Sequence, residues 1–315
     1  MSFGIGVTLS FVAAIAWGSS MVIFKVGIKN TDPLVATYIK GIVAVPVLIL
    51  LGWILYGVES LALLFTYPNS LWLFLATVSI TFGDFFSLFA LKKINVSIAQ
   101  PISAVYPFFT TLILLIAKIE KITWVIITGT LVIIFGVSII SYFTQKTSNQ
   151  EAKREHDKNN GKNTKYGIIL SVLAATFWGL TIVFTRLILN GEGVEVISMM
   201  GIRNGLMVVM AFILVLIRAS IKRDNFMKNI FTQKKEAFIL MGGGAIAWCI
   251  GGVSFFTAVT MIGAGISTPL SSISPFIVTI LSLVFLKEKI TRKQILGIII
   301  IVAGSILLSL NENFS

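Results

Sequence analysis

The sequence has little of what most enzyme active sites are built from. It contains one cysteine, Cys249, one histidine, His156, and 13 acidic residues, against 25 lysines and arginines. A single cysteine excludes an intrachain disulfide. No histidine, cysteine or carboxylate spacing matches a metal site or an acid–base pair. We therefore expect no enzyme activity, no metal and no cofactor.

Charge of either sign is also scarce. Charged residues make up 12% of the 315 residues and apolar residues 56%, with a mean hydropathy of +0.95. This composition excludes an ordinary water-soluble domain and predicts a protein that crosses the lipid bilayer many times. The net charge of +12 does not indicate a nucleic-acid partner, because the cations fall in short connections between apolar runs.

The apolar runs predict the number of membrane spans. At about 20 residues per crossing, the chain contains ten candidate spans. These cover residues 4–25, 33–56, 70–91, 95–117, 122–143, 166–188, 194–217, 237–260, 264–286 and 293–310. Residues 144–165 are too polar to enter lipid. The sequence thus predicts an all-α integral membrane protein with domains 1–143 and 166–311 joined by the linker 144–165.

The two halves repeat each other. Identical residues recur in the fourth and fifth spans of each half, at Pro101, Ser103, Pro107, Phe108, Thr111, Glu120, Lys121, Ile122, Thr123, Gly129 and Gly136. AAIAWG at 13–18 likewise meets AATFWG at 174–179, and Lys40 meets Arg203. Because each half has an odd number of spans, the second half enters the membrane from the opposite side. Such inverted repeats are typical of transporters.

These matches resemble the EamA-type repeats of the drug/metabolite transporter superfamily. The shared features are the tryptophan-glycine pair of each first span, the basic residue of each second span, the prolines of each fourth span and the E-K-I-T ending. The clearest stretch is FLKEKITRKQILGIIIIVAGSILL at 285–308. The resemblance implies a ten-helix basket around a central cavity that works by alternating access. It does not specify the substrate, the direction of transport or the coupling ion.

We therefore expect a secondary-active or facilitative transporter of a small polar metabolite in the cell membrane. A functional monomer is expected, because one chain supplies both inverted halves, and a dimer stays open. Two other functions also stay open. One is a multidrug or cation exporter. The related small four-span exporters are expected to use a carboxylate in the first span, whereas spans one and six of this chain hold Lys25 and Arg186. The other is a membrane solute sensor that transports nothing.

Ionisable residues inside the spans are functional candidates, because a charge in lipid is costly. Lys40 and Asp84 fall at similar depth, each about seven residues from the same end of its span. They form either a neutralising ion pair or a proton or ion relay. Arg203 matches Lys40 but has Gly252 where Asp84 stands in the first half. Its guanidinium suits a carboxylate or phosphate; alternatively it bonds backbone carbonyls or Glu195.

Aromatic residues near the middle of spans are candidates for lining the cavity. Trp17 and Trp178 lie there rather than in the interfacial belt where tryptophan is enriched. They either contact the substrate or fill the packing between helices. Trp248, Tyr38 and Tyr106 are further candidates of the same kind.

Two matched stretches, PISAVYPF at 101–108 and PLSSISPF at 269–276, place prolines inside an apolar span. Proline removes a backbone donor and crowds the preceding turn. We predict helix breaks there, serving as bends for alternating access or only shaping the basket. The prolines are Pro101, Pro107, Pro269 and Pro275. The hydroxyls expected to face the cavity are those of Ser103, Ser271, Ser272 and Ser274, with Ser271, Ser274 and Tyr106 as candidate substrate contacts.

The remaining polar and small residues have structural interpretations. Lys25 and Arg186 lie near the ends of their spans, from which long side chains reach the membrane interface. The repeated glycines are spaced to lie on one helix face at a close helix contact. They are Gly129, Gly136, Gly297 and Gly304, and the glycines of the eighth span fit close packing or a bend.

Lysine and arginine are concentrated on one side of the predicted spans. The linker and the connections 218–235 and 287–293 are rich in both, whereas the opposite side has little beyond Lys118, Lys121 and Arg186. The positive-inside rule then places the linker in the cytoplasm and both termini outside.

A reporter that is fluorescent only in the cytoplasm tests this orientation. Fused after Ser315, it is expected to stay dark, because the terminus lies outside. The same reporter inserted into the linker is the control and is expected to fluoresce. A bright fusion at Ser315 would contradict the orientation.

Overall fold

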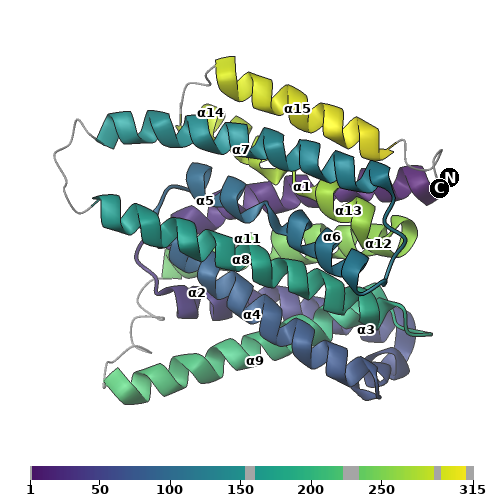
Figure 1. Cartoon of the computed structure of the whole chain (residues 1–315). Helices are drawn as coiled ribbons and strands as arrows, with labels where there is room; N and C mark the ends of the chain where they lie inside the picture. Colours follow the sequence, from purple (N-terminus) through teal and green to yellow (C-terminus); the bar gives the residue numbers. More distant parts are fainter. Residues whose placement is uncertain (1, 153–159, 223–233, 287–291, 310–315) are drawn as a thin grey trace.

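The computed structural model describes residues 2–152, 160–222, 234–286 and 292–309, and the regular structure of these ranges is helical (Figure 1). The linker residues 153–159, with His156, lie outside them, as does the second E-K-I-T motif at 288–291. In the first half, the elements are α1 (Ser2–Gly27), α2 (Pro33–Ile39), α3 (Gly41–Ala62), a 3-10 turn (Leu63–Phe65), α4 (Asn69–Lys93), α5 (Val96–Ser103), α6 (Tyr106–Ile116) and α7 (Trp124–Ala152).

The second half repeats this series of elements. It contains α8 (Asn160–Leu189), α9 (Val196–Lys222), α11 (Lys234–Ala245), a π-helical segment (Ile246–Gly252), α12 (Val253–Ile262), α13 (Ala264–Ser271), α14 (Ser274–Leu286) and α15 (Arg292–Ser309). Helical structure is present at all ten predicted spans. Helices α7 and α8 also extend into the predicted linker, at its two ends.

The chain is a multi-pass membrane protein. Within the described ranges, six helical segments are long and apolar enough to cross a bilayer, and four shorter apolar helices accompany them. Large apolar side chains on α3 face outward, with Trp53, Ile54 and Leu55 56%, 65% and 57% exposed. Such exposure suits lipid, which is as apolar as the side chains themselves.

The two halves run in opposite directions and pack against each other. In Figure 1, α1 runs from right to left, whereas its counterpart α8 runs from left to right. Helix α4 lies along α8, and α1 lies along the π-helical segment and α12, which is the same pairing with the halves exchanged. The pairs α3 with α9 and α7 with α15 also join one half to the other. Each of these helices thus buries a face on the opposite half.

The predicted breaks at the proline motifs are confirmed. The fourth span is divided into α5 and α6 at residues 104 and 105, and the ninth into α13 and α14 at 272 and 273. Pro101 and Pro269 lie in the last turns before the breaks, and Pro107 and Pro275 in the first turns after them. Proline is tolerated in a first turn, because the backbone donor it removes has no partner there.

The second span has a break that the sequence did not predict. Instead of one helix over 33–56, Lys40 separates α2 from α3. Asp32 starts α2, since its side chain accepts from the Leu34 amide at 3.0 Å and Pro33 occupies the first turn. Gly244 of α11 lies so close to the Lys40 backbone that a Cβ at this glycine would overlap it. The break thus coincides with the close approach of α11 to this span.

The expected glycine contact is confirmed between α7 and α15. A Cβ added at Gly136 would lie 2.8 Å from the Gly297 carbonyl oxygen, and one at Gly304 would lie 2.8 Å from Ile133 Cγ1. These glycines let the two backbones approach closely.

Gly136→Ala tests this contact. We expect a loss of about 1–3 kcal/mol in the free energy of unfolding, because the methyl group meets backbone atoms that cannot move independently. Unfolding of the purified protein in detergent would measure it. The matched control is Gly242→Ala in α11, where nothing lies within 4 Å of the added Cβ. Equal losses in the two variants would show that the glycine contact is not close-packed.

Candidate functional site

A cavity of about 120 Å³ lies between the two halves. Both halves contribute to its lining, through α1, α4, the α5–α6 segment, α8, α9, the π-helical segment, α12 and α14. Eight residues singled out in the sequence line it: Trp17, Lys40, Asp84, Tyr106, Trp178, Arg203, Trp248 and Ser274. Others, such as Gln100, Phe24, Phe255 and Phe256, were not predicted.

Lys40 enters the cavity from the break between α2 and α3. The side chain is 3% exposed and its Nζ bonds Asp84 Oδ2. Its ammonium group also lies 5.3 Å from the Phe24 ring centroid and 5.4 Å from that of Trp248. The ion pair and the two rings together compensate for burying this charge.

Asp84 joins the two halves of the protein. One carboxylate oxygen bonds Lys40, and the other accepts from Trp178 Nε1 of α8 at 3.0 Å. The ion pair, one of the two predicted alternatives, is thus present. In the described part of the chain, no three histidine, cysteine or acidic side chains come together as a metal site.

The two cavity tryptophans occupy equivalent places but use different acceptors. Each indole packs on a glycine of the facing half: a Cβ at Gly83 would lie 2.6 Å from Trp178 Cδ1, and one at Gly251 would lie 2.7 Å from Trp17 Cδ1. Trp178 donates to the Asp84 side chain, whereas Trp17 donates to the Ala247 carbonyl at 3.0 Å. Ala247 lies in the π-helical segment, an irregularity that is frequent at functional sites.

Arg203 of α9 is held by neutral groups. Its Nη1 donates to Thr185 Oγ1 at 2.9 Å, its Nε and Nη2 to Asn204 Oδ1 at 3.3 and 3.2 Å, and Nη2 also contacts the Met200 sulfur at 3.2 Å. The guanidinium lies 4.8 Å from the Phe256 ring centroid. The predicted alternatives of backbone carbonyls and Glu195 are therefore wrong, because Arg203 bonds these three side chains instead.

A buried polar cluster, Gln100, Tyr106, Ser271 and Ser274, connects the two helix breaks. Gln100 Nε2 donates to Ser274 Oγ at 3.0 Å, and the Tyr106 hydroxyl lies 2.9 Å from Ser271 Oγ. Gln100, Tyr106 and Ser274 line the cavity. Ser271 does not, and instead holds Tyr106 in place.

Ser103, Ser272 and Tyr38 were also expected to face the cavity, and this prediction is wrong. The hydroxyls of Ser103 and Ser272 bond the backbone carbonyls of Ala99 and Pro269 in their own helices. Tyr38 packs on Phe212 with ring centroids 5.3 Å apart, outside the residues that line the cavity.

Lys25 and Arg186, which the sequence predicts to reach toward the membrane interface, bond neighbouring segments of the protein. Lys25 Nζ bonds the Leu91 and Ile94 carbonyls at the end of α4. Arg186 Nε lies 2.7 Å from Glu120 Oε1. Lys25 is thus attached to the end of α4, and Arg186 to the connection between α6 and α7.

Glu120 has a structural role that the repeated E-K-I-T motif alone did not predict. Its two carboxylate oxygens accept from the Ala264 and Gly265 amides, at 2.8 and 2.9 Å, at the start of α13. A carboxylate is favoured there by the unpaired amides and the helix dipole. Recurrence of the glutamate in both halves was the signal available in the sequence.

Comparison with known proteins agrees with this architecture. A model of the EamA-like transporter family matches residues 4–142 and 165–310. The chain belongs to the EamA-like transporter family. This EamA protein is therefore a membrane transporter and not an enzyme. A crystal structure covering 97% of both chains superimposes with a TM-score of 0.69 at 14% identity, which supports the fold alone.

Several curated proteins are similar in sequence to this EamA transporter. A protein of Archaeoglobus fulgidus named "Uncharacterized transporter" is 22% identical over 96% of this chain and 98% of its own length. One of Listeria monocytogenes named "Putative sugar uptake protein" is 26% identical over 96% and 97%. An uncharacterized protein of Methanocaldococcus jannaschii is 30% identical over 97% of its own length but only 46% of this chain, roughly one repeat.

Lys40→Met tests the dependence of the fold on the buried ion pair. We expect a loss of about 3–5 kcal/mol in the free energy of unfolding, because Asp84 is left as a buried carboxylate without its cation. The double variant Lys40→Met, Asp84→Asn is expected to lose less. The exposed Lys29, replaced by methionine, is the control and should change stability by about 0.5 kcal/mol or less. Similar losses for Lys29→Met and Lys40→Met would contradict the assignment.

Proposed function

We propose that this transporter carries a small polar metabolite across the cell membrane by alternating access, with the cavity between its halves as the substrate site. The residues proposed to contact the substrate are Trp17, Lys40, Tyr106, Trp178, Arg203 and Ser274. Asp84 is proposed to hold Lys40 and Trp178 in position.

The observation that carries this proposal is the concentration of buried charge in the cavity. Lys40, Asp84 and Arg203 are 3%, 6% and 3% exposed. Charged residues at this depth are costly and mark solute or ion pathways in membrane proteins. Inverted-repeat transporters bind their substrates where the two repeats meet.

The helix breaks supply the flexible points that alternating access requires. The α5–α6 and α13–α14 breaks lie beside the cavity through Gln100, Tyr106 and Ser274. They are symmetry-related, so bending at one break in one state and at the other break in the opposite state would open the cavity to each side in turn.

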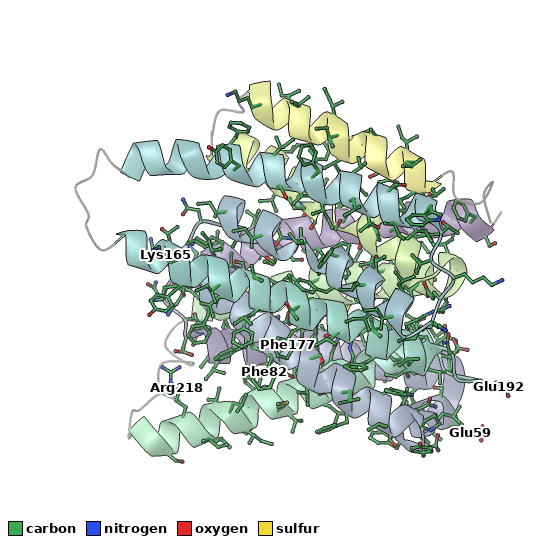
Figure 2. All side chains as sticks on the ribbon, viewed as in Figure 1. Glu59, Phe82, Lys165, Phe177, Glu192 and Arg218 are labelled. Carbon is green, nitrogen blue, oxygen red and sulfur yellow. The ribbon has the colours of Figure 1, made fainter. Side chains whose placement is uncertain are left out.

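Charge at the two ends of the molecule supports the proposed orientation, with the linker cytoplasmic and the termini outside. Figure 2 shows Lys165 and Arg218 at the end where α7 leads toward α8, and Glu59 and Glu192 at the opposite end. Basic residues favour the cytoplasmic side.

The cavity charges argue against a cation exporter. Two cations and one carboxylate line the site, and this excess of positive charge would repel a cationic drug. The name of the listerial relative concerns sugar uptake, which agrees with a small polar solute.

Thiol labelling tests alternating access without knowledge of the substrate. In a Cys249→Ala background the chain has no other cysteine, and Ser274→Cys then places one thiol in the cavity. A membrane-impermeant thiol reagent is expected to label it both in intact cells and in inside-out vesicles, because the cavity opens to each side in turn.

Ser171→Cys is the matched control. Ser171 is 0% exposed and bonded to the Gly167 carbonyl within α8, away from the cavity lining, and its cysteine should stay unlabelled. Labelling of Ser274→Cys from one side only, or from neither, would contradict alternating access and favour a solute sensor.

A further inference from the structure

We infer that the solute is a compact organic monocarboxylate, bound with its carboxylate on Arg203 and its apolar body among the cavity aromatics. This inference rests on the proposed use of the cavity as the substrate site. It assigns a charge and a shape to the solute, which neither the family nor the relatives specify.

The charge of the cavity lining is not balanced. Asp84 pairs with Lys40. Among the residues that the structure describes, no carboxylate lies within ion-pair distance of Arg203. Arg203 is nevertheless 3% exposed. A buried cation is strongly destabilised unless an anion accompanies it. One negative charge on the solute would make the occupied cavity neutral.

The hydrogen bonds of Arg203 leave a place for that anion. Thr185 and Asn204 accept from it as neutral groups, and the third partner is the Met200 thioether, a weak acceptor. The guanidinium has five N–H donors arranged as a planar fork that suits a carboxylate. A carboxylate would thus be a stronger acceptor than the present thioether contact.

The rest of the lining favours an apolar body over a sugar. The Trp17 and Phe255 ring centroids lie 4.9 Å apart, and those of Tyr106 and Trp178 6.4 Å. The lining hydroxyls of Ser20 and Thr181 bond the backbone carbonyls of their own helices, at 2.7 and 2.8 Å. A sugar carries a hydroxyl on most of its carbons. Several of the sugar hydroxyls would find no partner in this lining, and each unpaired hydroxyl would weaken binding.

Gln100 suggests one further feature of the solute. It is 4% exposed and lines the cavity, and its Oε1 has no hydrogen-bond partner among the described residues. A buried acceptor of this kind is satisfied by a hydroxyl or N–H on the ligand. The cavity of about 120 Å³ is somewhat smaller than the roughly 150 Å³ cavity that holds one benzene molecule, which favours a body no larger than one ring.

Ligand-induced thermal stabilisation of the full chain in lipid nanodiscs tests the inference. The probes are benzoate, 3-hydroxybenzoate and 4-hydroxybenzoate, each compared with its uncharged amide, together with D-glucose. At least one carboxylate is expected to raise the unfolding temperature in a dose-dependent manner, and its amide to bind about 10- to 100-fold more weakly. This comparison uses the wild-type chain and does not depend on any variant folding.

Variants then locate the carboxylate. Arg203→Gln is expected to abolish the difference between acid and amide, and Arg203→Lys to keep part of it. Lys93→Gln removes the same charge from an exposed position on α4 and should leave the difference unchanged. If Arg203→Gln does not fold, Arg203→Lys and the wild-type comparison still decide the outcome.

Three results would overturn the inference: acid and amide binding equally, D-glucose stabilising wild type and Arg203→Gln equally, or none of the carboxylates stabilising the protein. None of them affects the thiol labelling of Ser274→Cys. Labelling from both sides with no carboxylate binding would leave the carrier function standing and remove only the anionic substrate. Labelling from one side only would remove the carrier function itself.

Discussion

The Asp84 carboxylate is the contact on which the cavity depends. It receives the ammonium group of Lys40 from the α2–α3 break and the indole N–H of Trp178 from α8, and so connects one wall of the cavity in the first half with one in the second. Asp84 is 6% exposed, and both of its carboxylate oxygens are bonded to these donors. Asp84 therefore fixes Lys40 and Trp178 relative to each other, at the place where α4 packs on α8.

The second half repeats the fold around this contact but not its chemistry. Gly252 stands in place of Asp84, and the matching tryptophan, Trp17, donates to a backbone carbonyl in the π-helical segment instead. Arg203, which takes the place of Lys40, is consequently left with neutral partners. A symmetric scaffold thus carries a site with one neutralised cation and one available cation, and the two halves differ there by a single carboxylate.

Much of the fold was predictable, because the length of apolar runs and the repetition of motifs are local properties of the chain. The ten spans, the breaks at Pro107 and Pro275 and the Lys40–Asp84 pair depend on such properties. The roles of Glu120 and Gln100 do not, because the amides that Glu120 caps and the serine that Gln100 bonds lie in the other half. The break at Lys40 was also missed, and the contact that accompanies it, with Gly244 of α11, likewise comes from the other half.

The packing of each half on the other half also has a consequence for synthesis of the chain. Helix α4 packs on α8, and α1 on the π-helical segment and α12, so the first half emerges from the ribosome before any of its main partners exist. The faces of α1 and α4 that pack on the second half are therefore covered by it only after that half has been made. Because residues of both halves line the cavity, it forms only once the second half lies beside the first.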